Sequence, residues 1–494
     1  MSATRDAVLG VGGPLAAGPS DVLINEAFGA ELEQQRALLD DIGFADLAHA
    51  IMLLEVGAVP QSAGAELVGG LLALQARPDN FTLDPALGDV YTNREAWLSA
   101  HTGAAGWLGV GRARREAVTT GYTLAVRTRV LILVRALLHV GDAFVEVAER
   151  HASSLMPDYT YLQAGQPTTF AHYLLGFAFA LLRDLERSRA LFERFDRCPA
   201  GCGSTNGSTL PLDRERLGAL LGFSDLVEHA RDAMWQADGP IEALAVVCAA
   251  IVNLDRLAED LAIFATAEFG FITLADEHCR ASKVMPQKKN PFALAYVRAV
   301  ANRMIGVQAG VMAAGRTPSG QIDNRFVAYG DVPKALAEVA GAAELMAAVV
   351  RRLNLDITVA RATLDRSFAF SSDVAELVVR EGGVDYRTAH ALVARIARSA
   401  ERPTTEAIDA AAQAMLGRPL LLSPEDLRAA LDPLLALERR RGVGGAATRS
   451  VAAMVASVRA RLGETADWHA RTTDRLATAE RNLLEVARRT AGLH

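Results

Sequence analysis

Lysine is scarce in this chain. Among 51 basic residues only four are lysines, and three of them, Lys283, Lys288 and Lys289, lie within one seven-residue span, far from Lys334. A lysine ammonium is a compact, strongly hydrated point charge, whereas an arginine guanidinium is a broad planar fork. The clustering of lysine here, in a chain that otherwise uses arginine, therefore predicts an anion-binding pocket that is too tight for a guanidinium group.

Cysteine is rare as well. The chain has four cysteines in 494 residues, which are too few for a disulfide framework, and no second ligand pair stands at zinc-site spacing. They are Cys198, Cys202, Cys248 and Cys279. We therefore expect reduced thiols and a cytoplasmic protein. The sequence also contains no metal-ligand cluster, phosphate-binding glycine loop or nucleotide fingerprint, so we expect no metal and no cofactor.

Long apolar runs are missing too. No uninterrupted apolar run reaches the ~18 residues of a membrane helix. The glycine and proline content of the N-terminus argues against a signal peptide. The formal net charge of −7 lacks the basic excess of a nucleic-acid-binding protein. We expect a soluble intracellular protein with neither a membrane nor a nucleic-acid partner.

Strand-like alternation is infrequent, whereas alanine, leucine, arginine and glutamate are abundant, which predicts an all-α fold. Short helices are expected before residue 110, long ones up to residue 355, and shorter ones afterwards. We predict three helical domains, formed by residues 1–110, 111–355 and 356–494, with an irregular arm over residues 1–20 and a helical tail from about residue 463.

The middle domain is expected to be a long helix bundle. Its apolar residues recur at three- and four-residue steps, as between Ile241 and Phe264, and alanine fills much of the rest. A helix that is apolar all round must be covered all round. A large monomeric core and a bundle shared between subunits both satisfy this requirement. The expected long helices are about 112–153, 168–195, 228–268, 292–314 and 331–354.

The lysine-bearing stretch, residues 281–291, ends in a helix start. Asn290 followed by Pro291 is typical of an N-cap and the first residue of a helix that continues from Phe292. Free N–H groups at that helix end would favour a bound carboxylate. A solvated basic loop between two helices is the alternative interpretation.

Three other polar islands interrupt the helical pattern. Residues 109–116 place adjacent arginines at a helix start, where they could clamp carboxylates or simply face solvent. Residues 159–170 gather hydroxyls and amides before a helix, as a binding segment or a capping turn would. Residues 201–209 form a Gly/Ser/Thr-rich loop that could close over a ligand or merely connect helices.

The segment Ser-x-x-Met-Pro-x-Lys-x-Asn-Pro at 282–291 resembles the signature loop of the fumarase/aspartase superfamily, in the form found in argininosuccinate lyases. The resemblance runs from about Asn25 to Leu462. It implies a homotetramer with a twenty-helix core and active sites drawn from three subunits. Its further motifs are Gln166-Pro-Thr-Thr-Phe-x-His-Tyr-Leu-Leu175, Leu257-Ala-Glu-Asp-Leu261, Glu268-Phe-Gly-Phe271 and Gly442-Val-Gly-Gly445.

The resemblance also assigns roles to residues. Ser282 matches the catalytic base, whose hydroxyl needs activation by the helix end and neighbouring cations. Lys288 and Asn290 match residues that hold the fumaryl carboxylate, and Thr160 and Arg114 match further carboxylate contacts. The catalytic candidates are Ser282, Lys288, Thr160 and Tyr161, and the substrate-binding candidates are Asn290, Arg114, Arg115, Lys283, Gln163, Ala113 and Asn206.

Other family positions are changed. Tyr161 stands where the family has a catalytic histidine, and Ala295 where it has the paired glutamate, so both halves of that relay are gone. Ala113 and Arg115 replace a serine and an asparagine. The tract 322–325 replaces an amino-acid-binding tract. We therefore do not expect efficient cleavage of argininosuccinate.

Two hypotheses follow. The first is a carbon–nitrogen lyase that acts on another N-substituted succinate, with a leaving group stable as an anion, such as nitrite, or already cationic as an amine. Tyr161 or Lys283 would otherwise assist departure, and Arg115 would bind an extra anionic group. The second is a non-catalytic, crystallin-like structural or binding protein. The joint retention of Ser282, Lys288 and Asn290 favours the lyase.

Overall fold

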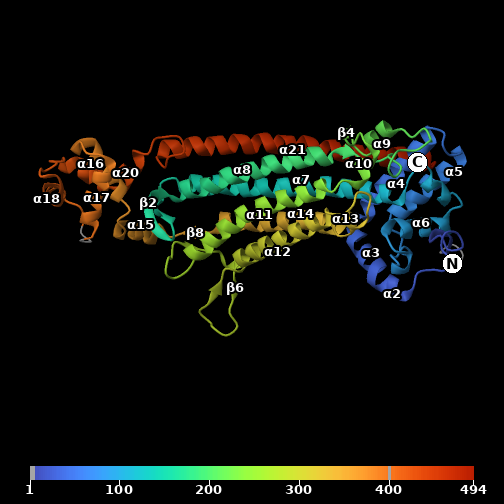
Figure 1. Ribbon diagram of the computed structural model, residues 1–494, viewed down its shortest axis with the longest axis horizontal. Coiled ribbons are helices and arrows are strands. Elements are labelled where there is room, and N and C mark those ends of the chain that lie inside the picture. The colour runs from blue at the N-terminus through green and yellow to red at the C-terminus, as the bar shows by residue number, and fades with distance from the viewer. Residues whose placement is uncertain (1–5, 399–401, 494) are drawn as a thin grey trace.

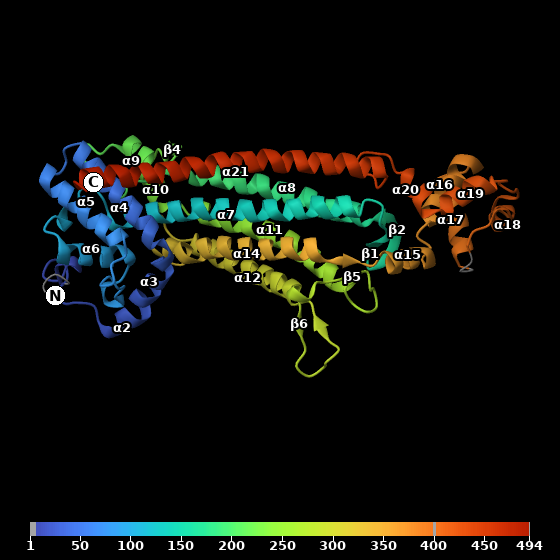
Figure 2. The ribbon, with the colours of Figure 1, turned by 180° about the vertical axis from the view of Figure 1, so that it is seen from behind.

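The computed structural model describes residues 6–398 and 402–493. The molecule is elongated: a bundle of long helices runs along its length, with a group of shorter helices at each end (Figure 1). Both chain ends lie at the same end of the bundle, as the view from behind also shows (Figure 2). In the described residues, no helix is both long and apolar enough to cross a membrane.

The five long helices that the sequence predicts are present, but the helix expected over 228–268 is divided into a short helix and a long one that starts at Asp238, and the helix expected from residue 331 starts at Ala328. Helix α7 packs against α8 and α14, and α11 packs against α8, α12 and α14. Their interior is one continuous core of alanine, leucine, valine and isoleucine side chains. The bounds are α7 Arg114–Arg150, α8 Phe170–Phe195, α11 Asp238–Phe264, α12 Phe292–Ala314 and α14 Ala328–Arg352.

The N-terminal helices form one end of the molecule, where α4 and α5 pack on the beginning of the bundle. They are α2 Asp21–Leu23, α3 Gly29–Gln35, α4 Leu39–Glu55, α5 Gln61–Gln75 and α6 Val90–His101. A π-helical segment at Ile24–Phe28 and 3₁₀ segments at Arg36–Leu38, Pro85–Leu87 and Ala105–Gly109 connect them. Three short helices lie nearer the bundle: α9 Arg214–Leu220, α10 Ala230–Trp235 and α13 Asp323–Phe326.

The helices after residue 355 form a second group with its own small apolar core at the other end of the bundle. They are α15 Ile357–Arg366, α16 Ser371–Gly382, α17 Tyr386–Ala397, α18 Thr405–Leu416, α19 Pro424–Leu431 and α20 Pro433–Glu438.

Helix α21, Thr448–Thr490, leaves this group and runs back along the bundle. It packs on α7 and α8 and reaches α4 and α5. The helical tail expected from about residue 463 therefore begins earlier and belongs to the bundle by its contacts. The three-domain division at residues 110 and 355 stays a proposal.

Short strands correct the all-α expectation: the chain is mostly helical, with four two-stranded sheets in the described residues. They escape the sequence pattern because most are only two residues long. The strands are β1 Leu155–Thr160 with β2 Gln163–Thr169, β3 Arg197–Cys198 with β4 Asp225–Leu226, β5 Ile272–Thr273 with β8 Asn354–Leu355, and β6 Arg280–Ala281 with β7 Lys289–Asn290. A 3₁₀ turn, Asp276–His278, lies between β5 and β6. All these sheets are antiparallel except β3–β4.

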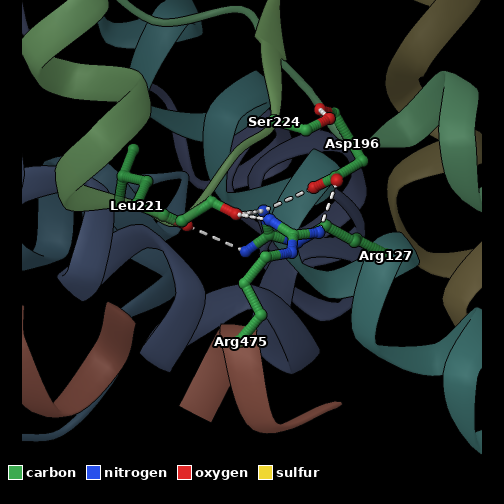
Figure 3. A network of polar contacts seen from close by, with 6 residues as sticks. Arg127, Asp196, Leu221, Ser224 and Arg475 are labelled. Atoms are coloured by element: carbon green, nitrogen blue, oxygen red, sulfur yellow. Dashed lines mark hydrogen bonds and ion pairs between the residues drawn. The ribbon is translucent and has the colours of Figure 1, made fainter. Parts of the chain in front are cut away.

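A polar network fixes α21 to the bundle (Figure 3). Asp196, directly after α8, accepts from Arg127 of α7 at 3.1 Å and from Arg475 of α21 at 2.5 Å. Both guanidinium groups also donate to the carbonyl oxygen of Gly222. One nearly buried carboxylate, 4% exposed, thus joins three helical segments that are far apart in the sequence.

Candidate active site

The lysine-bearing segment is a β-hairpin that projects from the bundle (Figures 1 and 2). Strands β6 and β7 pair at its base. At its tip, the N–H of Ser282 donates to the carbonyl of Lys288 at 3.1 Å, and the N–H of Lys288 donates to the carbonyl of Met285 at 3.0 Å. These bonds fold residues 282–288 into a compact turn.

The hydroxyl oxygen of Ser282 lies inside this turn. It accepts from the N–H of Met285 at 3.0 Å and from the N–H of Val284 at 3.3 Å. Hydrogen bonds donated to an ionisable oxygen favour its deprotonated form. The two donors would favour a deprotonated hydroxyl at Ser282, and among the described residues no histidine bonds to it.

The predicted N-cap role of Asn290 is wrong. Its side-chain amide donates to the carbonyl of Arg280 at 2.9 Å across the hairpin. Pro291 occupies the cap position of α12, without a side-chain capping bond. The residue belongs to β7 because the hairpin continues to the start of the helix, so its amide braces the base of the signature segment.

The three clustered lysines differ in their contacts. Lys289 donates to the carbonyl of Leu274 at 2.7 Å and pairs with Asp276 at 2.5 Å. The hydrogen bond to that carboxylate raises the pKa of Lys289. Lys283 and Lys288 are exposed on the turn itself. Among the described residues, Lys283 and Lys288 are therefore the two clustered lysines without an ion pair, and Lys289 is the one that has one.

Thr160 and Gln163 are paired at the tip of the β1–β2 hairpin. The sequence indicates a polar segment here but does not predict a hairpin. The turn residues between them, Tyr161 and Leu162, have φ values of 55° and 56°. Such left-handed backbone is uncommon outside glycine, and strain of this kind concentrates at functional sites. Tyr161 is 98% exposed, so it is available to another molecule.

A third group lies at the beginning of α7. Arg114 is the first residue of that helix, and its Nε lies 3.0 Å from Oδ2 of Asp89. The N–H of Ala113 donates to the carbonyl of Gly203 at 3.1 Å, which holds loop 201–209 against the helix start. Asn206 is exposed in this loop. The sequence separates these residues, but the fold brings them together.

Arg115 is half-buried beside Arg114. Its Cζ atom lies 4.5 Å from the centre of the Trp235 ring, and burial lowers its pKa. Glu31 lies nearby, and its pKa is raised by burial first and by Asp89 second. Sequence reasoning misses Trp235, Glu31 and Asp89. Only Asp89 leaves a signal, because an aspartate before a helix is a typical N-cap and it caps α6 here.

The candidate residues thus form three groups: those on the lysine-bearing signature hairpin, those at the tip of the β1–β2 hairpin and those at the beginning of α7. Within one chain, these three groups do not form a single site. Arg114 begins α7 and the β1–β2 hairpin follows its end, and a 37-residue helix is about 55 Å long. The signature hairpin projects from the side of the bundle (Figure 2). Ala295, at the position where the resemblance leads us to expect a glutamate, is exposed on α12. Among the described residues, no group of three His, Cys, Asp or Glu side chains is placed to hold a metal ion.

Comparison with known proteins identifies the family. The lyase family model matches residues 17–306, and the model of the argininosuccinate lyase C-terminal region matches residues 368–438. The argininosuccinate lyase of Methanosarcina acetivorans is 31% identical over 480 residues, covering 96% of this chain and 97% of the relative. The chain is an argininosuccinate lyase-like member of the fumarase/aspartase superfamily. The enzyme of Methanothermobacter thermautotrophicus is 32% identical over 82% of this chain and 89% of its own length.

Solved structures agree with this membership of the fumarase/aspartase superfamily. EDDS lyase in complex with formate matches with a TM-score of 0.86 and 28% identity over 96% of both chains. A variant of EDDS lyase with bound fumarate matches equally well, at 27% identity. Class II fumarase from Schistosoma mansoni shares the fold, with a TM-score of 0.69 and 13% identity over 80% of this chain and 90% of its own.

Proposed function

We propose that the protein is a carbon–nitrogen lyase that releases fumarate, or a close analogue, from an N-substituted succinate by β-elimination. The observation that carries the proposal is the hydroxyl of Ser282, held by two backbone N–H donors in a turn whose sequence matches the superfamily signature. The fumarate bound by the EDDS lyase variant supports the product.

In the proposed mechanism, Ser282 removes a proton from the carbon next to one carboxylate of the substrate. The electron pair of that C–H bond moves into the carboxylate as negative charge and then forms the carbon–carbon double bond, while the C–N electron pair leaves with nitrogen. Lys288 and Thr160 would hold the developing charge, and Arg114 the second carboxylate. Asn290 would keep the hairpin in place.

The proposed site requires several subunits. Arg114 and the β1–β2 hairpin lie at opposite ends of α7 within one chain. Helix α12 also carries exposed apolar side chains that a partner would cover: Phe292, Tyr296, Ile305 and Met312. We infer a cytoplasmic homotetramer in which α7, α8, α11, α12 and α14 of four chains form a twenty-helix core. Each site would take Arg114, Thr160 and Ser282 from different chains.

The leaving group would differ from that of argininosuccinate. With Tyr161 and Ala295 at the relay positions, the chain lacks the family's acid pair. A departing nitrogen that is stable as nitrite, or that is already a cationic ammonium before it leaves as a neutral amine, needs no such acid. Tyr161 or Lys283, both exposed next to other proposed site residues, would protonate any other leaving group. Arg115 would bind an additional anionic substituent.

The test is a panel of N-substituted succinates that includes argininosuccinate, together with nitrosuccinate. Purified protein is incubated with each, and fumarate is followed by its absorbance; the reverse reaction uses fumarate and candidate amines. Ser282→Ala should lower kcat by about 10²–10⁴-fold, the usual contribution of a general base. Ser423→Ala, at an exposed cap of α19 that belongs to none of the three groups, should leave turnover unchanged.

Absence of turnover for every compound in both directions would support the non-catalytic, crystallin-like alternative instead. Near-normal turnover of the Ser282→Ala protein would assign the base to another residue. Efficient cleavage of argininosuccinate itself would show that the altered relay positions do not exclude the family's own reaction.

A further inference from the structure

A cavity of about 700 Å³ lies behind the group of residues at the beginning of α7. Its walls come from α7, the end of α8, α10, the start of α11 and α13. Tyr122, Phe195 and Pro240 contribute apolar surface to it. The volume is within the range of small-molecule sites, and the lining combines polar and charged side chains with apolar ones.

Arg325 lines this cavity and is only 4% exposed. Its Nε and Nη1 atoms are buried and have no hydrogen-bond partner among the described residues, and no carboxylate there pairs with it. A buried guanidinium without a counter-ion destabilises a fold, so such groups are normally paired. Its Nε and Nη1 donors are therefore unsatisfied in the cavity wall, where the carboxylate of a ligand would satisfy them.

The hydroxyl of Tyr122 is a second available donor in the same wall. This residue is 2% exposed, and its hydroxyl has no partner in the described chain. Burial raises its pKa, so the hydroxyl stays protonated. The neighbouring Tyr329, whose ring centre lies 5.2 Å from that of Tyr122, is different because its hydroxyl is 2.9 Å from Oγ1 of Thr119.

Acidic residues line the cavity as well. Glu242 pairs with Arg194 at 3.3 Å, and Asp232 accepts from Gln236. Glu228 and Asp238 are exposed to solvent. Arg325 and Tyr122 thus add one unpaired cation and one hydroxyl donor to a wall that also carries Phe195 and Pro240, a combination that suits a carboxylate on an apolar body.

We propose that this cavity binds a small organic acid, with its carboxylate on Arg325 and Tyr122 and its apolar or aromatic part against Phe195. Two sources fit this chemistry.

The cavity lies close to the proposed substrate site, because Arg115 precedes Thr119 of the cavity wall by four residues and so lies one turn away on the same face of α7. The acid is therefore either the departing half of a substrate or a separate effector molecule.

Binding is tested on the full-length protein by calorimetry, with phenylacetate as the probe and phenylacetamide as its uncharged match. Phenylacetate should bind at least tenfold more tightly than the amide. Arg325→Gln should lower phenylacetate affinity at least tenfold, and Tyr122→Phe several-fold. Arg189→Gln is the control, because this arginine of α8 is not among the residues that line the cavity, has a 51% exposed side chain and lies 3.2 Å from Glu193; it should change little.

Thermal unfolding separates a binding role from a structural one. Without ligand, Arg325→Gln should unfold at a higher temperature than the parent, because an uncompensated buried charge is removed. Phenylacetate should then raise the unfolding temperature of the parent but not of the variant. Equal binding of acid and amide, no binding of either, or unchanged affinity in both the Arg325→Gln and Tyr122→Phe proteins would overturn the proposal.

Turnover measurements distinguish the two sources of the acid. Competitive inhibition of fumarate release by phenylacetate would assign the cavity to the departing half of the substrate. A change in kcat without competition would assign it to an effector. The binding measurement does not depend on turnover, so failure of the proposed lyase reaction would leave this inference testable on its own.

Discussion

At the scale of single residues, Asp41 makes the stability of the protein depend on pH. This carboxyl stands in the first turn of α4, and burial raises its pKa to about 7, with Arg129 acting in the opposite direction. Its ordinary value is 3.8. An acid whose pKa is raised by folding stabilises the folded state most below its unfolded pKa, and this contribution is lost as the pH rises through the folded value.

We therefore expect the free energy of unfolding to fall between about pH 4 and pH 7, and Asp41→Asn to weaken that decline. One pKa unit corresponds to about 1.4 kcal/mol, so the change is of the order of a few kcal/mol. Urea unfolding at a series of pH values measures it. Asp40→Asn is the control, since that side chain is 50% exposed and pairs with Arg77. Parallel pH profiles of the parent and Asp41→Asn proteins would contradict the assignment.

The sequence identifies some residues of the candidate site and not others. Ser282 and Lys288 can be found because the signature segment is continuous. Trp235 and Arg325 acquire their importance only from folding, which brings Trp235 against Arg115 and Arg325 into a cavity wall. Contacts of this kind join residues about a hundred positions apart and leave no local pattern.

At the scale of secondary-structure elements, the network around Asp196 determines how firmly α21 is attached. Removing one partner of a buried ion pair is strongly destabilising, by about 3–5 kcal/mol, because a charge is left uncompensated. Asp196→Ala would leave the positive charges of Arg127 and Arg475 without their carboxylate partner (Figure 3). We expect a loss of this size in urea unfolding and faster proteolytic cleavage within α21.

The control for this prediction is Glu149→Ala. Glu149 also joins α7 to α21, through Arg459, but both side chains are largely exposed, at 46% and 59%. Exposed pairs contribute about 0–1 kcal/mol. If both substitutions cost the same, burial of the Asp196 network would not be the source of its contribution.

The long helices follow from the sequence because their apolar residues repeat at helical spacing over many turns. The hairpins do not, because pairing between strands of two to seven residues depends on the partner strand rather than on local composition. The start of α21 at Thr448 likewise depends on tertiary contacts rather than on local sequence. The helix follows the turn at residues 442–445 and packs on α7 and α8.

At the scale of the whole molecule, the separation of the three groups makes subunit sharing testable. Ser282→Ala and Arg114→Ala should each be inactive alone. Suppose that every site takes these two residues from different chains of a tetramer. In tetramers assembled at random from equal amounts of the two variants, a site then receives an intact Ser282 with a probability of one half and, independently, an intact Arg114 with a probability of one half. Co-expression of the two variants should therefore restore about a quarter of parental activity. Sites contained within one chain would restore none.

The decisive comparison is with two substitutions on the same hairpin. Ser282 and Lys288 lie on one turn, joined by the 3.1 Å bond between their backbones, so every site receives both from the same subunit. Mixing Ser282→Ala with Lys288→Ala should give no recovery, although the tetramers assemble equally well. Recovery in the first mixture and not in the second would require that Arg114 and the signature hairpin meet across a subunit interface.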